Sequence, residues 1–205
     1  MKKIQLLLFS ITLIAFIGCK DETKKVEEEV VQEVKKEEGE EVEKAEKVVK
    51  KVTGANAYVS FALEPKSGTK ARGKAGMTEK DGEVTLEVKI SGLEPGTHAI
   101  HIHEKADCSS ADGKSSGGHW NPTFQDHGKW GDPKGYHKGD IGNFVVSEDG
   151  VGHVNFTTDE WCIGCGDEKR DVLGKAIIVH QGTDDFTSQP SGAAGARVSC
   201  GGIIQ

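Results

Sequence analysis

Two histidines separated by one residue, His101 and His103, form the first pattern in the sequence that could do chemistry. In a β-strand, residues two apart point to the same face, about 6.6 Å apart along the strand. Two imidazoles placed in this way can bind one metal ion, while Ile100 and Ile102 enter the core. Such a pair also occurs for purely structural reasons, so alone it does not establish a metal site.

More residues of metal-binding types follow this pair. They are four histidines and one aspartate: His119, His127, His137, Asp140 and His180. Imidazole suits copper and zinc, whereas calcium and magnesium prefer oxygen ligands. The sequence therefore predicts a centre for copper and zinc. We interpret the two other histidines, His98 and His153, as structural or exposed, because each stands by itself.

Alternating apolar and polar residues predict that β-strands position these ligands. The expected strands lie around residues 59–63, 84–90, 100–103, 144–146, 151–156, 176–180 and 197–200. Dipeptides typical of turns, such as Asp81-Gly82 and Asp149-Gly150, separate them. Many short strands with glycine-rich connections favour an all-β antiparallel sandwich or barrel.

Two connections between the expected strands are too long for simple turns. They run from Glu104 to Ile141 and from Thr183 to Ala196, and both are rich in glycine, serine and aspartate. Connections of this length in a compact domain are usually functional. We therefore expect both of them to take part in the site.

The composition argues against several classes of protein. Hydrophobic residues make up 35% of the chain and 27 of its 205 residues are glycine, which favours a loop-rich β domain over a helix bundle. The formal net charge is −7, and the basic residues form no patch with interleaved aromatic residues. A nucleic-acid partner is therefore not expected.

The first 18 residues have the features of an export signal. Lys2 and Lys3 precede a short apolar run, residues 4–17, which is too short to span a membrane. The run ends in Gly18-Cys19, which resembles the lipobox of bacterial lipoproteins. We expect cleavage before Cys19, a lipid on that cysteine and attachment to a membrane of the cell envelope, on its periplasmic or outer face. Secretion without a lipid is the alternative.

Residues 19–53 would then be the lipidated cysteine followed by a stretch composed almost entirely of lysine, glutamate and valine. A partner-binding helix is one interpretation of this stretch. We prefer a self-repelling spacer, because its apolar stripe is thin. The folded domain is expected to occupy residues 54–205.

The mature domain contains four cysteines, Cys108, Cys162, Cys165 and Cys200. An even number in an exported protein is typical of disulfides. Cys162 and Cys165 form a CxxC motif, for which we prefer a disulfide that pins a surface loop. A redox or metal-binding pair, such as a copper-entry point, is the alternative.

Five blocks of residues, in order from about Ala55 to the C-terminus, carry a resemblance to a known family. They are His101-Ile-His-Glu104, Gly118-His-Trp-Asn-Pro122, His137-Lys-Gly-Asp-Ile-Gly-Asn143, Val179-His180 with Asp184-Asp185, and Gly195-Ala-Arg-Val-Ser-Cys-Gly201. These blocks resemble those of copper–zinc superoxide dismutases, here in a bacterial lipoprotein form. The resemblance implies a Greek-key β-sandwich or flattened eight-stranded barrel, immunoglobulin-like, with two long functional loops.

The resemblance also implies one copper and one zinc ion per chain. The copper ligands would be His101, His103, His119 and His180. The zinc ligands would be His119, His127, His137 and Asp140. His119 would thus bridge the two ions, and Asp184 would join the copper ligand His101 to the zinc ligand His127.

Three further residues receive roles from the resemblance. Arg197 would receive the anionic substrate, superoxide, and Cys108 would form a disulfide with Cys200. The loop before Arg197 carries no charge after Asp185. Lysines that attract superoxide would therefore lie elsewhere, and the candidates are Lys129, Lys134 and Lys138.

The implied activity converts two superoxide anions and two protons to oxygen and hydrogen peroxide, with copper cycling between Cu(II) and Cu(I) and with Arg197 and His119 as catalytic residues. The protein would protect the cell envelope from superoxide. The alternative is a non-catalytic envelope lipoprotein that stores or delivers copper or zinc. The presence of every copper ligand and of Arg197 favours the enzyme. A homodimer is left open.

Overall fold

The computed structural model describes residues 57–205. The expected signal peptide, the lipidation site at Cys19 and the charged spacer lie outside the described residues. The described chain forms eight β-strands and one short 3-10 helix. Among these residues, no helix has the length and apolar character needed to cross a membrane.

The eight strands pair antiparallel and close into a barrel in the order β1-β2-β3-β6-β5-β4-β7-β8. The strands are β1 Ala57–Pro65, β2 Arg72–Lys80, β3 Glu83–Ser91, β4 Gly96–His103, β5 Gly142–Val146, β6 Val151–Thr158, β7 Ala176–His180 and β8 Arg197–Gly202; the 3-10 helix η1 is Lys114–Ser116. Because β3 is not beside β4 and β6 is not beside β7, two connections cross over the barrel. The predicted all-β, eight-stranded barrel is confirmed.

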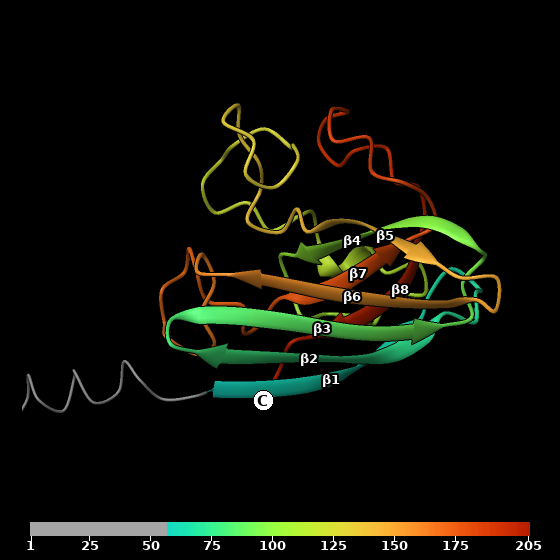
Figure 1. The fold of residues 1–205 in the computed structure, drawn as a ribbon, viewed down its shortest axis with the longest axis horizontal. Helices are drawn as coiled ribbons and strands as arrows, with labels where there is room; N and C mark the ends of the chain where they lie inside the picture. Colours follow the sequence, from blue (N-terminus) through green and yellow to red (C-terminus); the bar gives the residue numbers. More distant parts are fainter. Residues whose placement is uncertain (1–56) are drawn as a thin grey trace, which may run out of the picture. The chain divides into compact units, whose positions relative to one another are not determined.

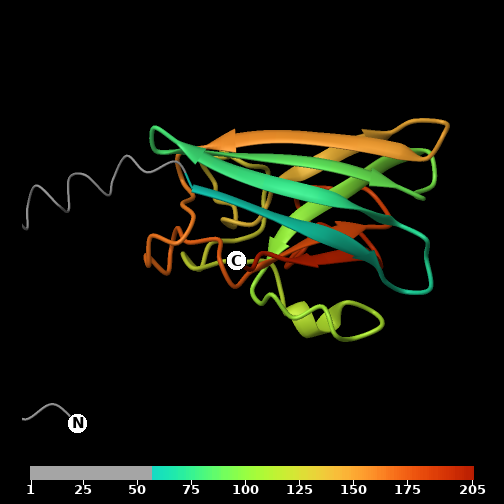
Figure 2. The same cartoon turned by 90° about the horizontal axis from the view of Figure 1, so that it is seen from below.

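The barrel is flattened into two four-stranded layers. Strands β1, β2, β3 and β6 pair along most of their length and form one layer, and β5, β4, β7 and β8 form the other (Figures 1 and 2). The seams between the layers are short. Strand β5 meets β6 only at the pair Val146 and Gly152, and β1 meets β8 only through Glu64 and Pro65.

The core between the layers follows the period-two pattern. In β3, the inward residues Val84, Leu86, Val88 and Ile90 are buried, and the residues between them are exposed or half-buried. Strand β2 has no counterpart in the sequence prediction. Its inward face consists of Ala75 and Met77, small or single apolar residues set among charged ones, and this pattern is too weak to indicate a strand.

Strands β4 and β7 are buried on both faces. Their inner face packs into the barrel core through Ile100, Ile102, Ile177 and Val179. Their outer face carries histidines and lies under the long connections. The structure confirms both long connections and adds a third, residues 159–175 between β6 and β7, which the sequence did not single out.

Candidate metal centre

Strand β4 places His101 and His103 on its outer face. His101 pairs in register with Ile178 of β7, and His180 ends the same strand β7. All three histidines are buried. The HxH spacing therefore presents two imidazoles side by side, and the neighbouring strand adds the third.

The connection 104–141 docks on β4 where the partner strand β5 stops. Pairing between β4 and β5 ends at Ile100. Beyond it, the Ile102 amide donates to Gly139 O (2.9 Å), and Ile102 O accepts from the Trp120 amide (2.8 Å). Position 139 must be glycine, because a Cβ there would lie 2.2 Å from Ile102 O. This docking brings His119 directly opposite His103.

Four histidines form the first ligand group, and their ligand atoms all lie within 4.8 Å of one another. The nitrogens without a hydrogen-bond partner are His101 Nδ1, His103 Nε2, His119 Nε2 and His180 Nε2. On the opposite side of the ring, His101 Nε2 donates to Asp184 Oδ2 (2.8 Å) and His103 Nδ1 donates to Gly117 O (2.9 Å). These bonds fix the tautomers, so that the bare nitrogens face the centre.

Asp140 organises the second ligand group. His119 Nδ1 donates to Asp140 Oδ1 at 2.8 Å, while His127 Nδ1 and His137 Nδ1 lie 3.0 and 3.2 Å from its oxygens. The last two nitrogens form no hydrogen bond despite these short distances. Backbone amides of Gly128 and His137 hold Asp140 Oδ2 in place.

His119 is the residue shared by the two groups. Its Nε2 belongs to the first group and its Nδ1 to the second. The centroid of its ring lies 4.0 Å from that of His101 and 5.3 Å from that of His127. One imidazole can therefore contact two ions, one through each nitrogen.

The chemistry of the donors fits copper and zinc. Six buried ring nitrogens have no hydrogen-bond partner, and each such group costs about 1–3 kcal/mol when left unsatisfied. The six nitrogens converge on two points instead of scattering through the core. Imidazoles with one carboxylate form the ligand set expected for these two metals.

The two groups differ in charge. Burial, with the neighbouring His119, holds the pKa of His103 well below its usual value, and burial with the neighbouring His101 does the same for His180. Burial also lowers the pKa of His119 to about 4, against the pull of Asp140. Although burial opposes it, the adjacent carboxylates of Asp140 and Asp184 raise the pKa of His127 to about 9. His103, His119 and His180 are therefore neutral imidazoles near neutral pH, whereas His127 is a cation paired with carboxylates.

Asp184 connects the two groups from behind. It is buried, and Oδ2 accepts from His101 Nε2 while Oδ1 accepts from His127 Nε2, both at 2.8 Å. Burial opposes ionisation, but these two hydrogen bonds keep the pKa of Asp184 below its usual value. Asp184 thus occupies the bridging position expected from the sequence.

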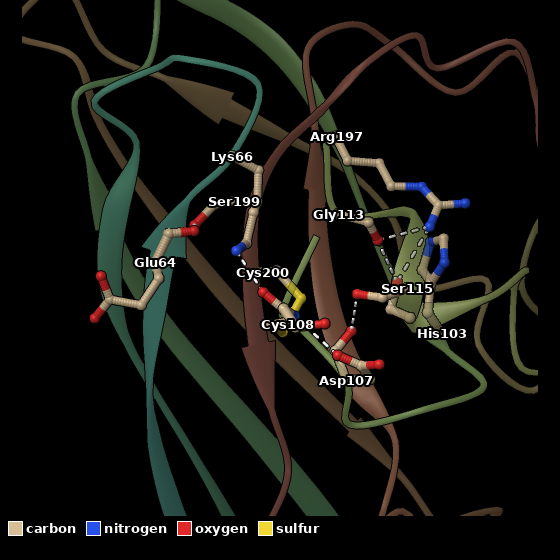
Figure 3. Close-up of a disulfide and its surroundings, with 12 residues drawn as sticks. Glu64, Lys66, His103, Asp107, Cys108, Gly113, Ser115, Arg197, Ser199 and Cys200 are labelled. Atoms are coloured by element: carbon tan, nitrogen blue, oxygen red, sulfur yellow. Dashed lines mark hydrogen bonds between the residues drawn. A yellow bond between two sulfur atoms is a disulfide. The ribbon is translucent and has the colours of Figure 1, made fainter. Parts of the chain in front are cut away.

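Arg197 lies at the start of β8, beside the first group. Its Nη1 donates to Gly113 O (2.9 Å) and to Ser116 Oγ (3.1 Å), as Figure 3 shows for Gly113. The guanidinium shares a cavity of about 620 Å³ with His103, His119 and His180. Sequence and structure therefore agree on a cationic group next to the first ligand group.

The disulfide between Cys108 and Cys200 anchors the loop that contacts Arg197. Lys66 Nζ, just after β1, donates to Cys108 O, and Ser115 Oγ donates to Asp107 O within the loop (Figure 3). The predicted pairing of these two cysteines is confirmed. The bond links the loop to β8, the strand that carries Arg197.

The comparison with known families agrees with this geometry. The family model for copper/zinc superoxide dismutase (SODC) matches residues 71–203. The chain belongs to the copper/zinc superoxide dismutase family.

Relatives and solved structures support this assignment. The chain is 33% identical over 160 residues to the superoxide dismutase-like protein YojM of Bacillus subtilis, covering 76% of this chain and 81% of the relative. It is 36% identical over 135 residues to Cu-Zn superoxide dismutase 2 of Aquifex aeolicus, covering 64% and 78%.

Two crystal structures are similar to this dismutase-family chain. The structure of a SOD-like protein from Bacillus subtilis superposes with a TM-score of 0.64 and 30% identity, covering 73% of this chain and all of the other. The structure of the clock protein EA4 superposes with a TM-score of 0.62 and 32% identity, covering 73% and 96%.

Three residues of this dismutase-family site were not found by sequence reasoning. Gln189 brackets the His127 backbone, accepting from its amide (2.8 Å) and donating to its carbonyl (2.9 Å). Asn143 forms two hydrogen bonds with the Asp184 backbone. Gly192 leaves room for the bridge, because a Cβ would lie 1.8 Å from Asp184 Oδ1. Of these three residues, only Asn143 belongs to one of the five sequence blocks that resemble the family, so only Asn143 could have been singled out from the sequence.

The lysines proposed to attract superoxide are not on the cavity wall. Lys129, Lys134 and Lys138 are absent from its lining, and Lys138 forms an ion pair with Glu160. The lysine that does line the cavity is Lys114, 3.1 Å from Asp112. Its position in η1 gave no signal in the sequence. The two remaining histidines behave as expected: His98 is buried with backbone partners, and His153 is exposed.

An aromatic cluster underlies the connection that carries the second ligand group. Its members are Trp130, Tyr136, Phe156 and Trp161. Trp161 Nε1 donates to Lys138 O (2.9 Å), next to His137. The following residue begins the CxxC motif, whose cysteines form the expected local disulfide. The connection 159–175 is thereby attached to the metal-binding loop.

Proposed function

We propose that this chain is a catalytically active superoxide dismutase. Copper would be bound by His101, His103, His119 and His180, and zinc by His119, His127, His137 and Asp140. The observation that carries the proposal is the shared cavity: His103, His119 and His180 of the first group line the same space as Arg197. A site for metal storage would not require a fixed cation beside the metal.

The reaction converts two superoxide anions and two protons to oxygen and hydrogen peroxide. Copper, when bound, supplies the one-electron oxidation and reduction that this reaction requires. Arg197 supplies the binding group, since its side chain is held by Gly113 and Ser116 and still has free N–H groups for a small anion. Burial lowers the pKa of Arg197, but a guanidinium stays cationic at any working pH.

His119 supplies the proton-handling group. Its Nδ1 donates to Asp140, so Nε2 is the ring nitrogen without a hydrogen-bond partner, and the residue lines the cavity. A proton taken up at Nε2 lies next to the space where the anion is held by Arg197. Asp184 keeps the neighbouring ring of His101 in position during this exchange.

The proposal extends to location. We propose a lipoprotein of the cell envelope with its lipid on Cys19, and the lipobox-like sequence supports this. The two disulfides are consistent with an oxidising compartment. A Cys19→Ala variant should move from the membrane fraction to the soluble fraction, and unchanged membrane association would contradict the lipid anchor.

The activity is tested with the full chain reconstituted with copper and zinc. We expect one ion of each per chain and rapid disappearance of superoxide. Arg197→Ala should lower the rate by about tenfold or more, equivalent to ~1.4 kcal/mol, without changing metal content. Arg197→Lys keeps the charge and should retain part of the rate. Full metal binding without dismutation would overturn the proposal and favour metal storage or delivery.

A further inference from the structure

The CxxC motif lies outside the metal centre and has no role in the proposed reaction. Cys162 is buried, and Cys165 is exposed in the connection 159–175. Their sulfurs and a carboxylate oxygen of Asp171 lie within 4.8 Å of one another. This is the one group of metal-ligand type outside the histidine centre among residues 57–205.

We propose that Cys162 and Cys165 form a second metal site, which opens when an external dithiol reduces their disulfide and which then binds a thiophilic ion, Cu(I). The proposal does not depend on superoxide dismutase activity. It rests on how the loop is held, on which sulfur is accessible, and on the coordination that the loop offers.

The loop is held by hydrogen bonds that do not involve the disulfide. Asp171 accepts from the amides of Gly164 and Gly166, both at 2.9 Å. Glu79 of β2 accepts from the Ile163 amide at 2.7 Å. The Cys162 backbone also pairs with the segment around Asp171. Because these bonds remain after reduction, the two thiols stay close together. Metal binding then does not have to order the loop, so it loses little conformational entropy.

The disulfide itself contributes little to the fold. It closes a loop with a sequence separation of only 3, whereas Cys108 and Cys200 are separated by 92. Cross-linking a short loop removes little entropy from the unfolded chain. The protein can therefore lose this bond and remain folded.

The unequal exposure of the two sulfurs sets the direction of reduction. A thiolate of the external dithiol attacks the exposed Cys165 Sγ, breaks the S–S bond and releases Cys162 as a thiolate. The second thiol of the reductant then attacks the mixed disulfide and releases Cys165. Two electrons and two protons pass to the protein, and the reductant becomes a disulfide. Binding of Cu(I) later displaces the two thiol protons into the solvent.

The coordination favours Cu(I) over zinc. Thiolates are soft ligands that select Cu(I), and this ion is satisfied by two of them. Structural zinc requires four ligands, but within residues 57–205 Asp171 is the only further group of this cluster. Its Oδ1 already accepts from two amides, those of Gly164 and Leu173. The adjoining cleft, at Gly166 and Asp171, also shares wall residues Glu104 and Asn121 with the cavity of the metal centre.

The test measures reduction and Cu(I) binding in the full chain, with copper and zinc already in the histidine centre. Graded dithiothreitol, followed by alkylation and peptide mapping, should open Cys162–Cys165 at concentrations that leave Cys108–Cys200 closed. Anaerobic titration with Cu(I) against a chromogenic Cu(I) chelator should then show one more bound equivalent per chain than in the unreduced protein.

The control is a Cys162→Ser/Cys165→Ser variant, which should lose that equivalent and keep its superoxide dismutase rate. Asp167→Asn changes an exposed carboxylate of the same loop and should keep it. If the double variant does not fold, reduced wild-type protein with both thiols alkylated serves in its place. Resistance of this disulfide to reduction until Cys108–Cys200 also opens would overturn the proposal, and so would a reduced protein that binds no additional Cu(I).

Discussion

On the copper side of the centre, three of the four proposed ligands come from the barrel strands β4 and β7, whereas all four proposed zinc ligands come from the connection 104–141. Strand β4 pairs with β7 through His101 and His103 and with β5 up to Ile100, and this pairing holds both histidines whether or not a metal is present. The zinc side has no such support, and its ligands are held by Asp140, by Asp184 and by the docking of the loop on Ile102.

The two sides of the centre also differ in the charge of their histidines. On the copper side His103 and His180 are buried as neutral imidazoles, and on the zinc side His127 pairs with two carboxylates. If both metals bind as proposed, copper would sit on strands that form without it, and zinc would hold together the loop that covers the copper. The following experiments test this division.

The largest effect is expected from His119→Ala, because His119 is the one residue common to both sides. Loss of a direct ligand should exceed the ~10–100-fold loss of affinity typical of an outer contact, and it should affect copper and zinc together. Metal analysis and the superoxide assay measure the result. His137→Ala is the matched comparison and should release zinc while leaving most of the copper. Retention of zinc by the His119 variant would contradict a shared ligand.

Acidification of the metal-free protein should separate the two sides next. The folded pKa of His119 is about 4 and its usual value is 6.5, so the unfolded chain binds more protons below pH 6.5. Stability should therefore fall as the pH falls, by roughly 3 kcal/mol from His119 alone near pH 4. His103 and His180 act in the same direction.

His127 has the opposite sign. Its folded pKa of about 9 lies above 6.5, so its contribution is complete below pH 6.5 and is lost as the pH rises to about 9. The melting temperature of the metal-free protein should therefore be highest near pH 6.5–7, between the pH ranges in which His119 and His127 lose their contributions. A melting temperature that does not change between about pH 7 and pH 4 would contradict neutral imidazoles on the copper side.

A smaller and symmetrical effect is expected from Asp184→Asn. An amide cannot accept from both His101 and His127 as the carboxylate does. Both metals should bind about 10–100-fold more weakly. Asp126→Asn removes a charge from an exposed neighbour of His127 and should leave both affinities unchanged. A loss confined to one metal would show that the carboxylate does not couple the two sides.

The smallest effect is expected from Lys114→Gln at the cavity wall. Loss of an exposed charge near Arg197 should slow the capture of superoxide only a few-fold, and only at low ionic strength, because salt screens exposed charges over about 10 Å. Lys134→Gln, away from the cavity, should have no effect. The rate is measured at several salt concentrations, and an equal loss in both variants would exclude a local role for Lys114.

The parts of the molecule that sequence could predict are those with a strong local period or a block resemblance. The alternation in β3 indicated a strand, and the HxH pair indicated two ligands on the strand β4. Strand β2 was not predicted because its buried positions are only Ala75 and Met77, set among small, polar and charged residues. It is a strand because β1 and β3 pair with it on both sides, which no local pattern encodes.

The same limit applies within the site. Gln189 and Gly192 lie in a polar loop with no period, and their importance follows from what they approach: the His127 backbone and the Asp184 carboxylate. Likewise, Lys114 reaches the cavity because the 3-10 helix η1 is tied to β8 by Arg197 and by a disulfide across 92 residues. Contacts of this kind join residues that are far apart in the sequence. They form only when the barrel closes, so no local sequence pattern predicts them.

The chain contains three tryptophans, Trp120, Trp130 and Trp161, and each of them lies in or against the connection that carries the zinc ligands. The layer formed by β1, β2, β3 and β6 has none. Intrinsic tryptophan fluorescence is therefore a local optical reporter of that connection, and far-ultraviolet circular dichroism reports the barrel. A spectrometer that records both signals would follow the covering of the metal centre separately from the folding of the strands, with no label attached.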